Sequence, residues 1–165
     1  MGQVTVLMGI SGAGKSTWIR GNLWIQSKHC TEFSADHWFM KEDENGEVTY
    51  QFNPAELGQA HAHCLKLYTE ALQAGARADD PDPRYQNLVV DNTNTSLAEI
   101  APYCALALAY GFELKIVALV CPAEVAAKRN EHGTPATAVM RQDSRFRQTL
   151  ADLPPWWPLE VVFTD

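Results

Sequence analysis

The sequence lacks the features that would place it among membrane, secreted or zinc-binding proteins. No apolar run approaches the roughly 18 residues of a membrane span, and no basic stretch precedes the short apolar run at the N-terminus, as it would in a signal peptide. The four cysteines are far apart and include no CxxC pair. We therefore expect reduced thiols in a cytoplasmic protein that has no membrane partner and no zinc site.

Basic residues are scarce. Lysine and arginine number 13 against 20 aspartates and glutamates, which gives a net charge of −7. A protein that coats nucleic acid usually has a basic surface, so the charge excludes a general nucleic-acid coat. It leaves open an enzyme that binds one end of a strand in a local pocket. With 165 residues, 46% of them hydrophobic, we expect one domain over residues 1–165 with a sizeable core.

Apolar runs and turn signals alternate along the chain. Strands are expected at 4–8, 31–34, 88–91, 114–120 and 160–163, and helices at 15–25, 53–75, 96–108, 122–129 and 134–150. This alternation predicts an α/β fold with about five parallel strands and helices on both faces of the sheet.

Local signals refine several of these elements. Asn53 and Pro54 are typical of a helix start, and Ser96 with Glu99 forms a second capping signal. Pro102 should kink its helix or delay its start. Residues 41–50 are expected to form a loop or hairpin over the sheet edge.

A glycine-rich motif follows the first strand. Residues 9–16, GISGAGKS, match G-x-x-x-x-G-K-[ST]. Glycines allow successive backbone N–H groups to surround a polyphosphate, while Lys15 can reach the β- and γ-phosphates and Ser16 can bind Mg²⁺. A random match in a chain of this length has a probability on the order of half a percent, so the motif predicts binding of a nucleoside triphosphate with Mg²⁺.

Two acidic residues follow expected strands. Asp91 comes directly after 88–90, where a phosphate-loop enzyme holds a second carboxylate near Mg²⁺. Asp36 follows 31–34 and could accept the proton of an attacking hydroxyl, since ligands bind beyond the carboxyl ends of parallel strands. On the sequence alone Asp36 could equally be a surface acid, and His37 is an alternative base.

Four segments together resemble the polynucleotide-kinase-like group of phosphate-loop phosphotransferases. They are GISGAGKST, SADHWF, VVDNTNT and AKRNEHGTP, and the resemblance runs from about residue 4 to 140. It implies a P-loop kinase fold with a short helical lid. It also implies that Asp36 is the general base, that Arg129 contacts the phosphates and that the D-N-T-N segment shapes the acceptor side.

The resemblance completes the list of expected site residues. The ATP contacts are Gly9, Ser11, Gly12, Ala13, Gly14, Lys15, Ser16, Thr17 and Arg129. The metal ligands are Ser16 and Asp91, and the acceptor contacts are Asp36, Trp38, Phe39, Asn92, Thr93 and Asn94. Trp38 and Phe39 could stack on a base or ring, or belong to the core.

The chain also departs from the related phage kinase domain. That group has an arginine where this chain has Phe39, and a second lid arginine where it has Gly133. Arg141 and Arg145 share a helix face and could serve the lid or the acceptor, or lie on a solvated face. His61 is expected to be a hydrogen-bonded core residue.

These observations predict an ATP-dependent kinase that phosphorylates a hydroxyl group. A polynucleotide 5′-OH is the first expected acceptor. The alternative is a small hydroxyl compound such as a nucleoside, sugar, antibiotic or modified base, which the acidic charge and Phe39 favour. A second alternative, from another class, is a nucleotide-binding switch or ATPase without an acceptor.

Overall fold

The computed structural model describes residues 2–24, 30–77 and 79–165. Five parallel strands form the central sheet in the order β2-β5-β1-β6-β7. They are β1 (Gln3–Met8), β2 (Thr31–Phe33), β5 (Asn87–Val90), β6 (Glu113–Val120) and β7 (Leu159–Phe163). The α/β fold with a five-stranded parallel sheet is thus confirmed. β1 occupies the centre and pairs with β5 on one side and β6 on the other.

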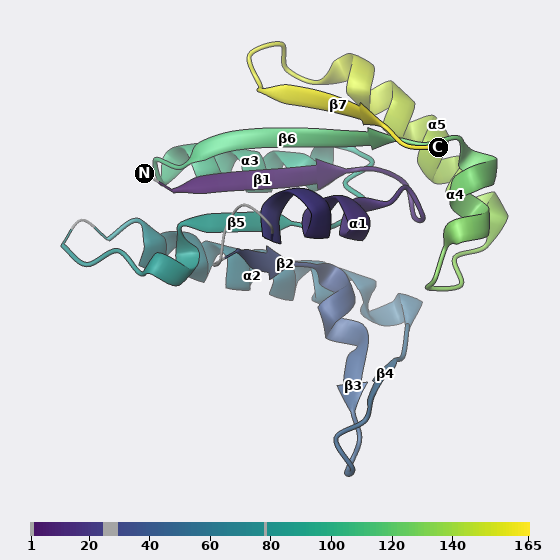
Figure 1. The fold of residues 1–165 in the computed structure, drawn as a ribbon, viewed down its shortest axis with the longest axis horizontal. Helices are drawn as coiled ribbons and strands as arrows, with labels where there is room; N and C mark the ends of the chain where they lie inside the picture. The colour runs from purple at the N-terminus through teal and green to yellow at the C-terminus, as the bar shows by residue number, and fades with distance from the viewer. Residues whose placement is uncertain (1, 25–29, 78) are drawn as a thin grey trace.

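Helices cover both faces of this sheet. α1 (Lys15–Ile19) lies in front of it in Figure 1, and α2 (Leu57–Gly75) and α3 (Leu97–Ala109) lie behind it. The sheet core is almost free of solvent contact, with Val6, Leu7 and Ile116 at 0% exposure. None of the helices in the described ranges is both long and apolar enough to cross a membrane.

The first helix differs from the expectation of one helix over 15–25. α-Helical geometry ends at Ile19 and a π-helical turn, Arg20–Trp24, follows. Asn22 donates a side-chain hydrogen bond to the Trp18 carbonyl at 2.9 Å. Such side-chain bonds compete with the backbone ladder, and Gly21 has a weak helix propensity. The expected last residue, Ile25, lies outside the described residues.

The capping predictions agree with the structure. Asn53 accepts a hydrogen bond from the Ala55 N–H, although the first turn, Pro54–Glu56, is a 3₁₀-helix that leads into α2. Ser96 and Glu99 form a reciprocal capping box at the start of α3. The helix begins at Leu97 with Pro102 inside it, so the start is not delayed.

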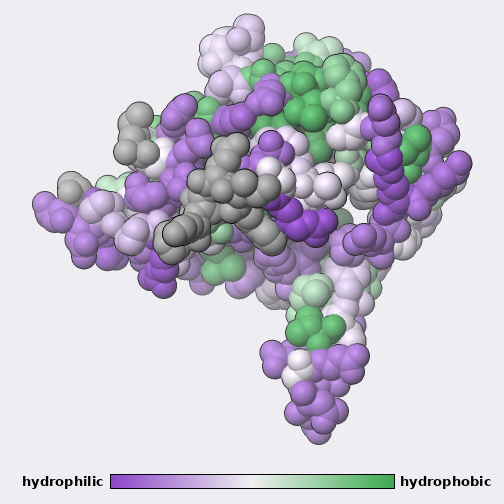
Figure 2. Space-filling model, viewed as in Figure 1, coloured by the Kyte–Doolittle hydropathy of each residue, from purple (hydrophilic) through white to green (hydrophobic). Residues whose placement is uncertain are grey.

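Three remaining features surround the carboxyl ends of the strands. The 3₁₀-helix η2 (Ala35–Phe39) follows β2, and the hairpin of β3 (Met40–Glu42) and β4 (Val48–Tyr50) follows η2. The hairpin projects away from the sheet (Figure 1), and hydrophilic residues cover its free end (Figure 2). α4 (Ala123–Arg129) and α5 (Ala136–Asp152) follow β6. Away from these three features, a further short 3₁₀-helix, η4 (Pro83–Tyr85), precedes β5.

Candidate active site

The glycine-rich loop connects β1 to α1 and has the backbone geometry that its glycines predict. Gly12 and Gly14 have φ angles of 84° and 92°, a region that costs other residues about 1–2 kcal/mol. The two positions differ in their surroundings. A Cβ atom on Gly12 would lie 2.0 Å from the Ala126 carbonyl oxygen, whereas a Cβ on Gly14 would meet nothing within 4 Å. The loop therefore packs directly on α4 at Gly12.

This difference predicts unequal effects of two matched substitutions. Gly12→Ala should destabilise the protein more than Gly14→Ala, because both introduce backbone strain but only the first forces α4 away from the loop. We expect the Gly12 variant to lose about 1–3 kcal/mol more in free energy of unfolding, measured by urea denaturation. Equal losses in the two variants would show that the close packing on Ala126 is absent in solution.

Residues far away in the sequence hold the loop in place. The Gln142 side chain on α5 accepts a hydrogen bond from the Ser11 N–H at 2.9 Å. The Thr164 hydroxyl donates to the Ala13 carbonyl at 2.9 Å, and the Gly9 N–H donates to the Thr93 carbonyl at 2.9 Å. Sequence reasoning missed Gln142 and Thr164, since no local motif marks a residue that lies more than 100 positions from its partner.

Lys15 begins α1 and turns back over the loop. Its ammonium group donates to the carbonyl oxygens of Gly9 and Ile10 at 3.0 and 3.2 Å. Desolvation lowers the pKa of Lys15, and the nearby carboxylates of Asp91 and Asp36 offset part of that effect. Its hydrogen-bond partners in the loop are neutral carbonyl oxygens, and a charged polyphosphate would be a stronger partner for the ammonium.

Asp91 follows β5 and carries a buried oxygen without a protein partner. Its Oδ1 atom makes no hydrogen bond among the described residues. Burial raises the pKa of Asp91 to about 6, against the opposing effect of Lys15. A buried, unpaired carboxylate oxygen is unfavourable unless a cation or donor joins it. Because Asp91 and Ser16 line the same cavity, their oxygen atoms fit the preference of Mg²⁺ for hard ligands.

Asp36 lies on η2, directly beyond the carboxyl end of β2. The Ser34 hydroxyl accepts a hydrogen bond from the Asp36 N–H at 3.2 Å and so caps η2. The Asn92 side chain accepts one from the Ala35 N–H at 2.8 Å, which ties η2 to the end of β5. Asp36 itself is exposed, and its Oδ1 accepts a hydrogen bond from the Tyr50 hydroxyl at 3.0 Å.

These segments line one cavity of about 720 Å³ at the carboxyl ends of the strands. We call it the phosphate cavity, because the glycine-rich loop lines it. Arg129, the last residue of α4, and His132, in the loop that follows, also line it. Eleven of the expected site residues line it: Ser11, Gly12, Gly14, Lys15, Ser16, Thr17, Asp36, Asp91, Asn92, Thr93 and Arg129. A volume of this size accommodates a nucleotide-sized ligand.

Three expected acceptor contacts lie elsewhere. Phe39 is fully buried and its ring packs edge-on against Tyr50 and Phe52, so it has no free face on which a base could stack. Asn94 is also buried and donates to the Leu7 carbonyl at 2.7 Å. These two residues therefore support the core and the end of β1. Trp38 does not line the phosphate cavity. Its indole N–H donates a hydrogen bond to the Glu56 carboxylate.

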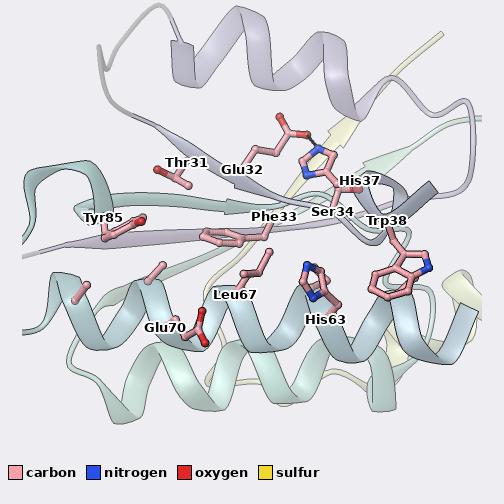
Figure 3. A pocket seen from close by; sticks show the side chains of 14 residues that line it. Thr31, Glu32, Phe33, Ser34, His37, Trp38, His63, Leu67, Glu70 and Tyr85 are labelled. Carbon is pink, nitrogen blue, oxygen red and sulfur yellow. Dashed lines mark ion pairs between the residues drawn. The ribbon is translucent and has the colours of Figure 1, made fainter. Parts of the chain in front are cut away.

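Trp38 and His37 face a second cavity of about 440 Å³ between β2 and α2 (Figure 3). The His37 ring points to Glu32, with 3.6 Å between Nε2 and Oε1. The neighbouring Glu32 carboxylate is the main reason that the pKa of His37 is raised. Asp36 and His37 thus line different cavities, and of the two only Asp36 shares its cavity with the phosphate loop. The geometry favours Asp36 over the alternative.

The two arginines considered on the last helix, Arg141 and Arg145, both lie outside the phosphate cavity. The Arg145 guanidinium donates to the Thr95 hydroxyl at 2.8 Å and lies 4.0 Å from Glu99, so it ties α5 to the start of α3. Arg141 is exposed, and neither arginine lines the phosphate cavity. His61 on α2 is half-buried and also lies outside this cavity.

Comparison with known proteins agrees with the fold and the phosphate loop. In structure the chain is similar to a component of the Pnkp1/Rnl/Hen1 RNA repair complex, with a TM-score of 0.67, 16% identity and coverage of 93% of this chain. It spans 46% of the length of that component. It is also similar to a sugar kinase from Janibacter sp., with a TM-score of 0.58 and 20% identity over 99% of this chain and 86% of the other.

Those identities are low enough that the likeness concerns the fold alone. The family assignment comes from the sequence, because the model of a family described as AAA domain, AAA_33, matches residues 4–152. This range includes the phosphate loop, Asp36, Asp91 and Arg129. The chain therefore belongs to the AAA_33 family of P-loop, kinase-like AAA domains.

Proposed function

We propose that this protein transfers the γ-phosphoryl group of ATP to a hydroxyl group of a second substrate. The observation that carries the proposal is that two residues from different segments line the same cavity. Asp36 lies on η2, after β2, and Lys15 lies at the end of the phosphate loop, after β1. A carboxylate with one oxygen held by Tyr50 can accept a proton through its other oxygen. A nucleotide switch has no need for such a base.

The reaction that this arrangement supports is an in-line displacement. The acceptor oxygen forms a bond to the γ-phosphorus while the bond from that phosphorus to the bridging oxygen breaks, and ADP leaves. Asp36 takes the proton of the acceptor hydroxyl. Lys15 and Arg129 stabilise the negative charge on the phosphoryl oxygens.

Ser16 and Asp91 are the residues that would hold Mg²⁺, which when bound supplies positive charge to the phosphate oxygens. The unpaired Oδ1 of Asp91 supports this assignment. Backbone amides of the glycine-rich loop and of the start of α1 would bind the phosphates, and Gln142 and Thr164 keep that loop in its shape.

Two acceptors are supported by different observations. A polynucleotide 5′-OH is supported by the resemblance of the GISGAGKST, SADHWF and VVDNTNT segments to polynucleotide kinases. A small hydroxyl compound is supported by Phe39, which is fully buried where the related kinases have a phosphate-binding arginine, and by the net charge of −7. The sugar kinase is similar to this chain in length as well as in structure, which agrees with a small hydroxyl compound as acceptor.

A panel of acceptors tests the proposal and separates these two. Purified protein is incubated with ATP labelled on the γ-phosphate, Mg²⁺ and, in turn, a 5′-OH oligonucleotide, nucleosides and sugars. If the acceptor is a polynucleotide, we expect the oligonucleotide to be phosphorylated faster than its own 5′-terminal nucleoside. The apparent affinity for the oligonucleotide should fall only weakly as the salt concentration rises, because few phosphates are contacted. Equal activity on oligonucleotide and nucleoside at every salt concentration would favour the small acceptor.

A further inference from the structure

Tyr50 connects the hairpin to the proposed base. It is the last residue of β4, and its hydroxyl donates to Asp36 Oδ1 at 3.0 Å. The next residue, Gln51, is also bonded to η2, because its N–H donates to the Phe39 carbonyl at 2.8 Å. The base of the hairpin is therefore bonded to both ends of η2, the short helix that carries Asp36.

The Tyr50 ring contacts two other rings. One is Phe39, with ring centroids 6.1 Å apart in an edge-on contact. The other is His132, with centroids 4.6 Å apart and ring planes inclined by 38°. A group that orients another must be fixed in place, and these contacts restrict the rotation of Tyr50.

His132 links this cluster to the lid loop between α4 and α5. The Asn130 side chain braces that loop, accepting from the His132 N–H at 3.0 Å and donating to the Thr134 carbonyl at 2.8 Å. His132 and Arg129 both line the phosphate cavity. The tyrosine ring thus lies between the residue that would take the proton and the loop that would contact the phosphates.

We propose that Tyr50 is a positioning residue that holds the Asp36 carboxylate toward the acceptor hydroxyl. The inference rests on the proposed function. Asp36 is exposed, and an exposed carboxylate samples several rotamers. A hydrogen bond to Oδ1 selects one of them and leaves Oδ2 to receive the proton. Burial and the neighbouring Asp36 raise the pKa of Tyr50, so its hydroxyl remains a donor near neutral pH.

Tyr50→Phe removes the hydroxyl and keeps the ring between Phe39 and His132. We expect kcat to fall roughly ten- to hundredfold, as for the loss of a hydrogen bond to a charged group, with ATP affinity unchanged. Tyr110→Phe is the matched control, since it also removes a tyrosine hydroxyl, one that is bonded to Gln73 and distant from the cavity lining. Its kcat should equal that of the wild type.

The same substitution in an Asp36→Asn background separates positioning from a structural role. If Tyr50 acts through the Asp36 base, Tyr50→Phe should cost little further activity there, because the two losses are not additive. An equal fold-loss in both backgrounds, or a Tyr50→Phe variant as active as wild type, would overturn the inference while leaving Asp36 as base. Full activity of Asp36→Asn alone would overturn the role of Asp36 as base, and this inference with it. Failure of the wild type to phosphorylate any acceptor would overturn the proposed function itself.

Discussion

Lys15→Ala is expected to reduce phosphoryl transfer by about 10³-fold or more at saturating ATP and Mg²⁺. The ammonium lies 3.0 and 3.2 Å from the carbonyl oxygens of Gly9 and Ile10 in the phosphate loop, and it balances the carboxylates of Asp91 and Asp36. Removing a group that stabilises developing charge in a transition state typically costs 10²–10³ in rate, and more in phosphoryl transfer. The fold should survive, since Lys15 is not part of the apolar core.

The measurement for this variant is transfer of the γ-phosphoryl group, with circular dichroism to confirm folding. Lys66→Ala serves as the control, because Lys66 is an exposed lysine on α2 whose partner is Glu70, one helical turn away. That variant should behave as the wild type. Near-normal turnover of a folded Lys15→Ala protein would remove the assignment of residues 9–16 as the phosphate site.

Asp36→Asn is expected to lower kcat by roughly 10²–10⁴-fold, the usual contribution of a general base. The amide keeps the size of the carboxylate and can still accept the hydrogen bond from Tyr50, but it cannot take the proton. Affinity for ATP should stay nearly constant, since our proposal assigns those contacts to the phosphate loop and Arg129. Calorimetric titration with ATP and steady-state transfer kinetics measure the two quantities separately.

His37→Gln is the matched control for this variant. His37 neighbours Asp36 in the chain but faces Glu32 in the other cavity, so its loss should leave kcat close to that of the wild type. If His37→Gln lost transfer and Asp36→Asn did not, the base would be His37. Parallel losses of rate and ATP affinity in Asp36→Asn would instead place Asp36 in the metal site.

The parts of this fold that sequence reasoning predicted depend on local signals. The phosphate loop, the Asn53 cap and the Ser96–Glu99 capping box each lie within a few residues, and the structure shows all three. The strands were recognisable because buried parallel strands are continuous apolar runs. The rule that ligands bind beyond the carboxyl ends of parallel strands correctly predicts that Asp36 and Asp91 lie at that edge of the sheet.

Sequence reasoning gives the wrong environment for residues whose position depends on contacts with segments far away in the chain. Phe39 follows Trp38 in an exposed-looking segment, but Tyr50 and Phe52 return from the hairpin to bury it. The D-N-T-N segment was assigned to the acceptor as a unit, yet Asn94 has a φ of 47° and turns its side chain to the end of β1. Tyr50 carried no motif at all, since its role depends on a hairpin that brings it within 3.0 Å of Asp36.

The central claim is that the γ-phosphoryl group goes to a hydroxyl that Asp36 deprotonates. It is tested most directly by following ATP labelled on the γ-phosphate through a single turnover, with the best acceptor of the panel present, for wild type and Asp36→Asn. We predict that the label moves from ATP to the acceptor in the wild type, and does so roughly 10²–10⁴ times more slowly in the variant. Label found only as inorganic phosphate, released at the same rate by both proteins, would contradict the claim and indicate an ATPase or switch.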